Sequence, residues 1–390
     1  MKMRFKALLL LISVALILLV NSCGSKNNEI KVIKSYKAVI EDSVMINRLS
    51  RVKLLDYNAY ENELLLHDRQ TREIILIDKK GEIISKFNPH VEGPSYAGDY
   101  DFGWSFYENK GLVCHSSYYF YQFDKQGNLI AKHPYPVEVS SLWLLDYDPV
   151  MIDSYTKNGE VEVLAFITGP VGPRYNSQAY QDSVNMLYAM NFNTGSSKPV
   201  MKKQPNSVYR SLGKFVDRGW PTIAKLKTSK FAQVFSIDTS VYIFDLDKDE
   251  LVNAIAIPKE FQPIYEPNEF GVRGEADIYR RNASIISTGE LMWVQVYGTI
   301  PASIEKELKR NGGDNYRETF EYTQAVKKYI NTTDLLFDEN EFLGELKFDI
   351  GLTSYDKVGG TDGSFWLHRN YEDERDYQTF LKVKIVEDKR

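Results

Sequence analysis

Three histidines stand at matching places in a repeated sequence pattern, and imidazole is the side chain that most readily binds metals or exchanges protons near neutral pH. His67, His115 and His368 each lie near the end of a predicted strand, the second strand of its repeat unit. Imidazoles that share a metal ion place their nitrogens about 2 Å from it, which strands of separate units do not allow. We therefore expect no metal and no cofactor. The histidines are predicted to be buried structural residues or, alternatively, part of a polar rim that binds a ligand.

A Gly- and Pro-rich loop, Pro170-Val171-Gly172-Pro173-Arg174-Tyr175, places a fixed charge beside an aromatic ring. A guanidinium donates several hydrogen bonds, and an aromatic face packs on apolar or sugar surfaces. Arg174, Tyr175 and the following Tyr180 are therefore the predicted ligand-binding residues of this loop. Ten of the 26 residues from 96 to 121 are also aromatic. For that segment, core packing is favoured over a sugar-binding platform.

Familiar catalytic signatures do not occur in the sequence. There is no Walker loop, no dinucleotide glycine pattern and no HExxH zinc motif. The segment from Asp245 begins like a calcium loop, but Glu250 stands where glycine is required and Ala256 where a bidentate glutamate belongs. Cys114 lies in an apolar stretch and is predicted to be an inert, buried thiol. With 53 acidic residues, the sequence alone selects no catalytic pair.

The second cysteine, Cys23, follows a segment with the composition of a secretory signal. A basic start is followed by an apolar run over residues 7–20 that only Ser13 interrupts, short of the roughly 20 residues that span a bilayer. Val20-Asn21-Ser22-Cys23 resembles the bacterial lipobox, in which the cysteine is acylated and the chain is cut ahead of it. The resemblance implies a lipoprotein signal peptide at residues 1–22, a lipidated tether at 23–29 and a lipid bilayer as a partner of acylated Cys23.

The residue after Cys23 and the net charge indicate where the protein is located and which partners it excludes. The residue directly after Cys23 is Gly24 and not Asp. By resemblance to the sorting pattern of Gram-negative lipoproteins, this favours the outer membrane, on either its periplasmic or its outer surface. The formal net charge is −5, and removal of three basic residues with the signal peptide makes it about −8. Recognition of nucleic acid requires a clustered basic surface. We therefore expect no nucleic-acid partner.

Recurring turns divide the rest of the chain into units of four strands, a to d. Turns rich in Asp, Asn, Lys and Gly, which tolerate positive φ or bond their own backbone, recur between strands c and d. A second type recurs six times between strands a and b, at 60–63, 107–111, 157–160, 228–230, 287–290 and 360–363. This pattern predicts an all-β, six-bladed β-propeller over residues 30–390. Two stacked β-sandwiches fit the strand content but not the turns.

The ends of this domain are expected to meet in one blade. The last unit lacks a fourth strand, and the segment 30–40 is a strand without a unit, so we place it as strand d of the last blade. The b–c connections at 169–183, 298–330 and 370–377 are long, which predicts that the b–c face carries function. The insertion at about 301–330 is predicted to be helical, as a rim-stabilising hairpin or as a lid.

The hairpin at 74–87, preceded by Leu64-Leu65-Leu66-His67-Asp68-Arg69, resembles the repeat of NHL and TolB-like propellers. With the lipobox, the layout is similar to that of six-bladed β-propeller lipoproteins of Gram-negative bacteria. This resemblance covers most of residues 30–390 and implies a fold and a location in the cell envelope. It carries over no catalytic residue.

These observations predict a membrane-anchored lipoprotein whose propeller binds an unidentified protein or glycan ligand at its b–c face without turnover. The alternative is a propeller enzyme, a hydrolase or lyase acting on carbohydrate, with paired carboxylates from the long loops.

Overall fold

The computed structural model describes residues 34–389 except 109, 117, 140–151, 168–170, 218, 273–276, 349–355, 372 and 374. The predicted signal peptide, Cys23 and the tether lie outside the described residues.

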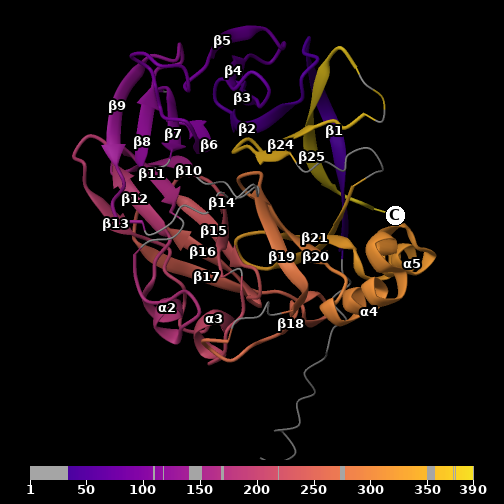
Figure 1. Cartoon of the computed structure of the whole chain (residues 1–390). Coiled ribbons are helices and arrows are strands. Elements are labelled where there is room, and N and C mark those ends of the chain that lie inside the picture. The colour runs from indigo at the N-terminus through magenta and orange to yellow at the C-terminus, as the bar shows by residue number, and fades with distance from the viewer. Residues whose placement is uncertain are drawn as a thin grey trace, which may run out of the picture. The chain divides into compact units, whose positions relative to one another are not determined.

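Four sheets in the described part of the chain contain four strands each, which follow one another in sequence and pair antiparallel with their neighbours (Figure 1). The first two sheets comprise β2 Val52–Asn58, β3 Glu63–Asp68, β4 Glu73–Ile77 and β5 Ile83–Phe87, then β6 Asp101–Phe106, β7 Leu112–Ser116, β8 Tyr119–Phe123 and β9 Leu129–Pro134. The next two comprise β10 Ile152–Lys157, β11 Glu160–Phe166, β12 Leu187–Asn191 and β13 Ser197–Pro199, then β14 Pro221–Lys225, β15 Lys230–Phe235, β16 Ser240–Asp245 and β17 Glu250–Ala256.

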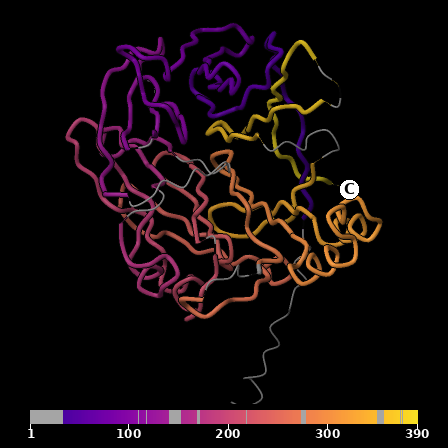
Figure 2. Tube along the Cα trace, in the orientation of Figure 1, coloured from indigo at the N-terminus to yellow at the C-terminus, as the bar shows by residue number. Residues whose placement is uncertain are grey.

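A fifth sheet has the strand order β18-β19-β20-β21-β22-β1-β25-β24-β23. Its strand bounds are β1 Lys34–Ile46, β18 Ile264–Glu266, β19 Asp277–Ser287, β20 Met292–Gly298, β21 Thr332–Phe337, β22 Phe342–Lys347, β23 Lys357–Gly359, β24 Ser364–His368 and β25 Gln378–Glu387. As expected for the N-terminal segment, β1 pairs antiparallel with β25, the last strand; Figure 2 shows the two chain segments side by side in indigo and yellow. The start of β1 also pairs parallel with β22.

The predicted turns lie where the sequence placed them, between the first and second or the third and fourth strands of each group. In two of them, the carboxylates of Asp78 and Asp124 accept hydrogen bonds from backbone N–H groups two and four residues ahead, at 2.8 to 2.9 Å. Gly81 and Gly127 follow with φ of +85° each. Because this chemistry is local, the sequence pattern locates these turns reliably.

Helices occur only in connections between the described strands: α2 Gln178–Ser183, α3 Val208–Ser211, η1 Lys259–Phe261, α4 Ala302–Gly312, η2 Gly313–Glu318 and α5 Phe320–Tyr329. The predicted helical insertion between β20 and β21 is therefore present. Its last helix, α5, begins at Phe320, because Thr319 caps it by accepting a hydrogen bond from the backbone N–H of Tyr322. A short 3₁₀ segment precedes it.

Neighbouring sheets bury their apolar faces against each other. Val234 and Ile243 of the fourth sheet, for example, share one core with Val294 and Leu335 of the fifth. Cys114 is a buried free thiol, as predicted. The aromatic segment mostly serves packing as well, since its buried side chains include Trp104, Phe106, Tyr107, Phe120 and Tyr121.

The first strand of each group lies innermost in this arrangement. β2 contacts β6 and β23, β6 contacts β10, and β19 contacts β14 and β23. Successive four-stranded meanders whose first strands contact one another make up a propeller-like all-β fold. Side chains on these first strands can therefore meet even though they come from distant parts of the sequence.

Candidate functional site

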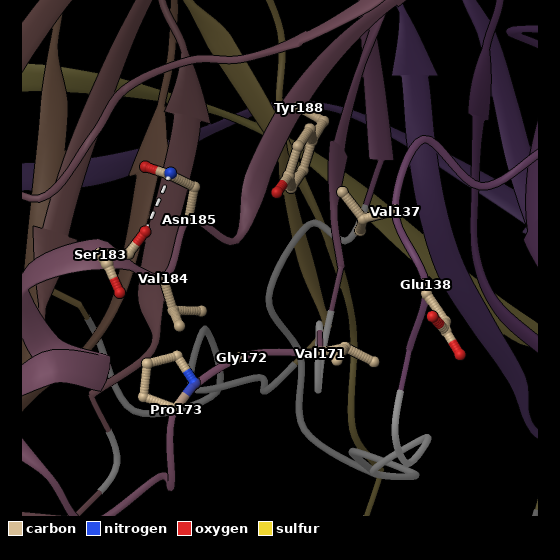
Figure 3. A pocket seen from close by; sticks show the side chains of 9 residues that line it. All are labelled: Val137, Glu138, Val171, Gly172, Pro173, Ser183, Val184, Asn185 and Tyr188. Carbon is tan, nitrogen blue, oxygen red and sulfur yellow. Dashed lines mark hydrogen bonds between the residues drawn. The ribbon is translucent and has the colours of Figure 1, made fainter.

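The long b–c connection of the third sheet forms a wall of a pocket of about 320 Å³ (Figure 3). Ser177 caps α2 with its side chain, and α2 ends at Ser183 with Val184 as its C-cap. The chain after α2 then enters the pocket wall. On the opposite side, the backbone N–H of Val171 donates to the carbonyl oxygen of Glu138 at 2.8 Å. The lining residues are Val137, Glu138, Val171, Gly172, Pro173, Ser183, Val184, Asn185 and Tyr188.

The pocket combines apolar walls with a few polar groups. The side-chain amide of Asn185 donates to the carbonyl oxygen of Ser183 at 3.3 Å, and Figure 3 shows the Tyr188 hydroxyl directed toward the pocket. Among the described lining residues, Glu138 is the single carboxylate. Such a lining suits recognition of a ligand.

The three loop residues predicted to bind ligand do not line this pocket. Tyr175 donates its hydroxyl to Asp217 at 2.6 Å, and its ring meets that of Tyr180 edge-on at 5.1 Å. Burial raises the pKa of Tyr180 to about 12. Both rings therefore anchor the loop, whereas Arg174 is exposed at the edge of the pocket beside Pro173.

The three histidines occupy three strands, β3, β7 and β24, and the structure does not bring them together. The Nε2 atom of His115 meets the hydroxyl of Tyr135, and burial lowers the pKa of His115 to about 3. His368 Nε2 lies 2.8 Å from Oε1 of Gln378. Burial also lowers the pKa of His67. Within the described residues, no group of His, Cys, Asp and Glu could hold a metal ion.

Charged side chains of the innermost strands form a cluster that the sequence analysis missed. Lys225 on β14 places its Nζ 3.7 Å from Asp153 Oδ1 on β10 and 3.6 Å from Glu108 Oε1 in the turn after β6. Asp56 on β2 accepts a hydrogen bond from Ser105 Oγ at 2.6 Å. These charged residues carry no distinctive sequence signal, because β2 and β10 contain other charged or polar residues as well. Nothing in the sequence indicated that the strands meet.

The side chains of this inner charge cluster are largely shielded from solvent, and this shifts their pKa values. Burial raises the pKa of Asp153 to about 7. Burial opposes the charge of Lys225, yet the neighbouring carboxylates of Asp153 and Glu108 outweigh it and raise the pKa of Lys225. Solvent still reaches 18% of the Asp153 side chain and 22% of that of Lys225. Asp153 can therefore exchange a proton near neutral pH.

Comparisons with known proteins inform the fold. No protein-family model matches the chain, and no curated protein does. A solved structure of a DUF4221 family member from Bacteroides vulgatus is similar, with a TM-score of 0.58 and 12% identity over 90% of this chain and 99% of that one. A putative exported protein from Bacteroides fragilis has a TM-score of 0.47 and 11% identity, over 91% of this chain and 100% of that one.

At 12% identity, the first likeness shows a shared fold and nothing further. The repeated meanders and this shared fold define a propeller-like, mostly β protein. In the part of the chain that the structure describes, none of the helices has the length and apolar character needed to cross a membrane.

Proposed function

We propose that the chain is a lipid-anchored protein of the cell envelope whose six-bladed propeller binds a ligand or protein partner without turnover. In this account β1 closes the ring as strand d of the last blade. The antiparallel pairing of β1 with β25 supports the closure, and the six turns at their predicted places support the blade count.

The pocket of the third sheet is the observation that carries the binding function. A long b–c connection builds it, as expected for the functional face, and its volume of about 320 Å³ falls in the range of ligand sites, roughly 300–1,000 Å³. A single carboxylate, Glu138, is present among the described lining residues. That lining favours recognition over hydrolysis in this proposal.

A screen of the full chain in detergent against glycan and peptide arrays tests this proposal. Val171 is 55% exposed, so Val171→Asp adds a charge to the pocket wall at little expense in stability. We expect this variant to bind any ligand found by the screen at least about tenfold more weakly. Val252→Asp, at a site on β17 that is 47% exposed, is the control. An equal response of both variants would refute the assignment.

The anchor rests on the segment that ends at Cys23, and we propose the outer membrane as its location. Two or more acyl chains hold a protein stably on a bilayer, since each buried methylene contributes about 0.8 kcal/mol. Growth with labelled palmitate is expected to label the protein and not its Cys23→Ala variant. Label that persists in the variant would rule out acylation at this residue.

The inner charge cluster supports a second candidate, an enzyme that hydrolyses or cleaves carbohydrate. A carboxyl group that keeps its proton up to about pH 7, as Asp153 does, is suited to protonate a leaving group. The acids would then come from the innermost strands rather than from the long loops. Release of products from polysaccharides that is lost in Asp153→Asn and kept in Asp314→Asn, an exposed control, would favour this candidate.

A further inference from the structure

A second, much smaller cavity adjoins the pocket. It shares two lining residues with the pocket, Val184 and Asn185, and it has a volume of about 10 Å³. Lys203 and Gln233 provide its innermost polar groups, and the remaining lining residues are Met186, Leu187, Val200, Met201, Lys202, Pro221 and Phe235. We call it the inner cavity.

Two buried amides have polar atoms without partners among the described residues: Gln233 lines the inner cavity, and Gln181 lies beside Lys203. Gln233 is 1% exposed; its Nε2 donates to the carbonyl oxygen of Met201 at 3.0 Å, while its Oε1 accepts nothing. Gln181 is 2% exposed; its Oε1 accepts from Lys203 Nζ at 2.6 Å, while its Nε2 donates to nothing. Buried polar atoms are almost always paired, so an unpaired acceptor and an unpaired donor near one cation require an explanation.

The size and polarity of the inner cavity suit one small group that both donates and accepts hydrogen bonds, either a water molecule or a ligand hydroxyl. About 10–15 Å³ is the space that a single water-sized group needs. A hydroxyl both donates and accepts, so one hydroxyl can donate to Gln233 Oε1 and accept from Lys203. A carboxylate only accepts and would leave Gln233 unpaired. An apolar group would leave all the polar atoms unpaired.

We propose that the pocket and the inner cavity together form a saccharide-binding site. Sugar rings occupy the pocket against Tyr188, and one hydroxyl enters the inner cavity between Lys203 and Gln233. The polar lining of the pocket, Glu138 and Asn185, suits further hydroxyls. This inference rests on the proposed binding function of the pocket and names the class of ligand that it takes.

Titration calorimetry of the full chain in detergent tests the proposal with neutral probes: methyl glycosides and disaccharides of glucose, galactose, mannose and N-acetylglucosamine. Gln233→Met keeps the shape of the side chain and removes its amide. We expect at least a tenfold loss of affinity in a variant that still melts cooperatively, at a temperature lowered by the loss of the hydrogen bond to Met201. Gln295→Met is the matched control, because Gln295 is also the fourth residue of the second strand of its group, on β20. Its affinity should equal that of the wild type.

The outcomes separate this inference from the proposed function. Unchanged affinity of a correctly melting Gln233→Met variant would overturn the role of the inner cavity. A protein that binds a peptide in a manner sensitive to Val171→Asp, but none of the saccharide probes, would overturn the saccharide class and leave the binding function intact. A protein that binds neither kind of ligand would overturn both. Loss of affinity for one deoxy analogue of the bound sugar, seen in the wild type and absent in Gln233→Met, would support the proposal directly.

Discussion

Two buried charged side chains, Asp153 and Lys203, have pKa values that move in opposite directions for one physical reason. Burial raises the pKa of Asp153 to about 7 and lowers that of Lys203 to about 8. In both cases loss of contact with water disfavours the charged form. Because an acid and a base respond in opposite ways, the two residues give opposite contributions to the pH dependence of stability.

For Asp153, stability is expected to fall as pH rises. The folded chain keeps this proton up to about pH 7, whereas the unfolded chain releases it near pH 4. The folded state therefore binds more protons in that window, and its advantage declines from about pH 4 to 7. Relative to the wild type, Asp153→Asn should be more stable at pH 8 than at pH 5, by about 2 kcal/mol. Urea unfolding at both pH values measures this, and an equal difference at the two would contradict it.

For Lys203, stability is expected to increase with pH. The unfolded chain stays protonated up to about pH 10, whereas folded Lys203 loses its proton near pH 8. The unfolded state binds more protons between these values, so the wild type gains stability over that range. Lys203→Met should lack about 2 kcal/mol of that increase. Denaturant unfolding at pH 7.5 and 10 measures this change in the free energy of unfolding. An equal change in the wild type and in Lys203→Met would show that Lys203 keeps an ordinary pKa.

The residues of the site show what sequence could and could not indicate. The b–c loop of the third sheet was predicted to carry the site because its length and its Gly-Pro content are visible in the sequence. The assignment of Tyr175 and Tyr180 to ligand binding has no support from the pocket lining, because both rings pack inward and Tyr175 bonds Asp217. Asp153 and Lys225 escaped attention because their contact spans more than seventy residues of sequence and depends on tertiary packing.

Among the elements, β1 approaches β22 so closely that one position accepts only glycine. A Cβ at Gly344 would lie 2.0 Å from the carbonyl oxygen of Lys34. Gly93 has the same φ of +155° and open space around it. Both substitutions place a side chain at a φ that L residues rarely adopt. Only Gly344→Ala adds the clash with Lys34, so it is expected to destabilise the protein by about 2 kcal/mol more than Gly93→Ala does. Calorimetric melting compares them, and matching melting temperatures would show that β1 and β22 lie further apart.

Strand and turn positions were predictable because their chemistry is local: an Asp or Asn that bonds its own backbone, followed by a Gly with positive φ. The start of α5 was not predicted, because it depends on the hydrogen bond that the side chain of Thr319 accepts from the backbone of Tyr322. The parallel contact of β1 with β22 had no sequence signal, since register between distant strands depends on packing.

In the molecule as a whole, the first and last described strands, β1 and β25, lie side by side in one sheet. Val44 of β1 is 2% exposed and packs in one core with Trp366 and Phe380, whereas Val39 of the same strand is 41% exposed. Val44→Asp buries an unpaired charge and should destabilise the protein by about 4 kcal/mol or prevent cooperative folding. Val39→Asp should behave like the wild type. Circular dichroism during heating measures the melting temperatures of both variants. A Val44→Asp variant as stable as the wild type would mean that folding does not need β1.

The central claim is that ligand binds at the b–c face of the third sheet. Hydrogen–deuterium exchange of the full chain, with and without the tightest ligand from the array screen, tests this claim directly. The account predicts slower exchange in the ligand-bound protein over residues 171–175 and 183–188, which include lining residues of the pocket. Slower exchange confined to the a–b turns at 60–63 and 107–111, with no change at the pocket, would contradict it.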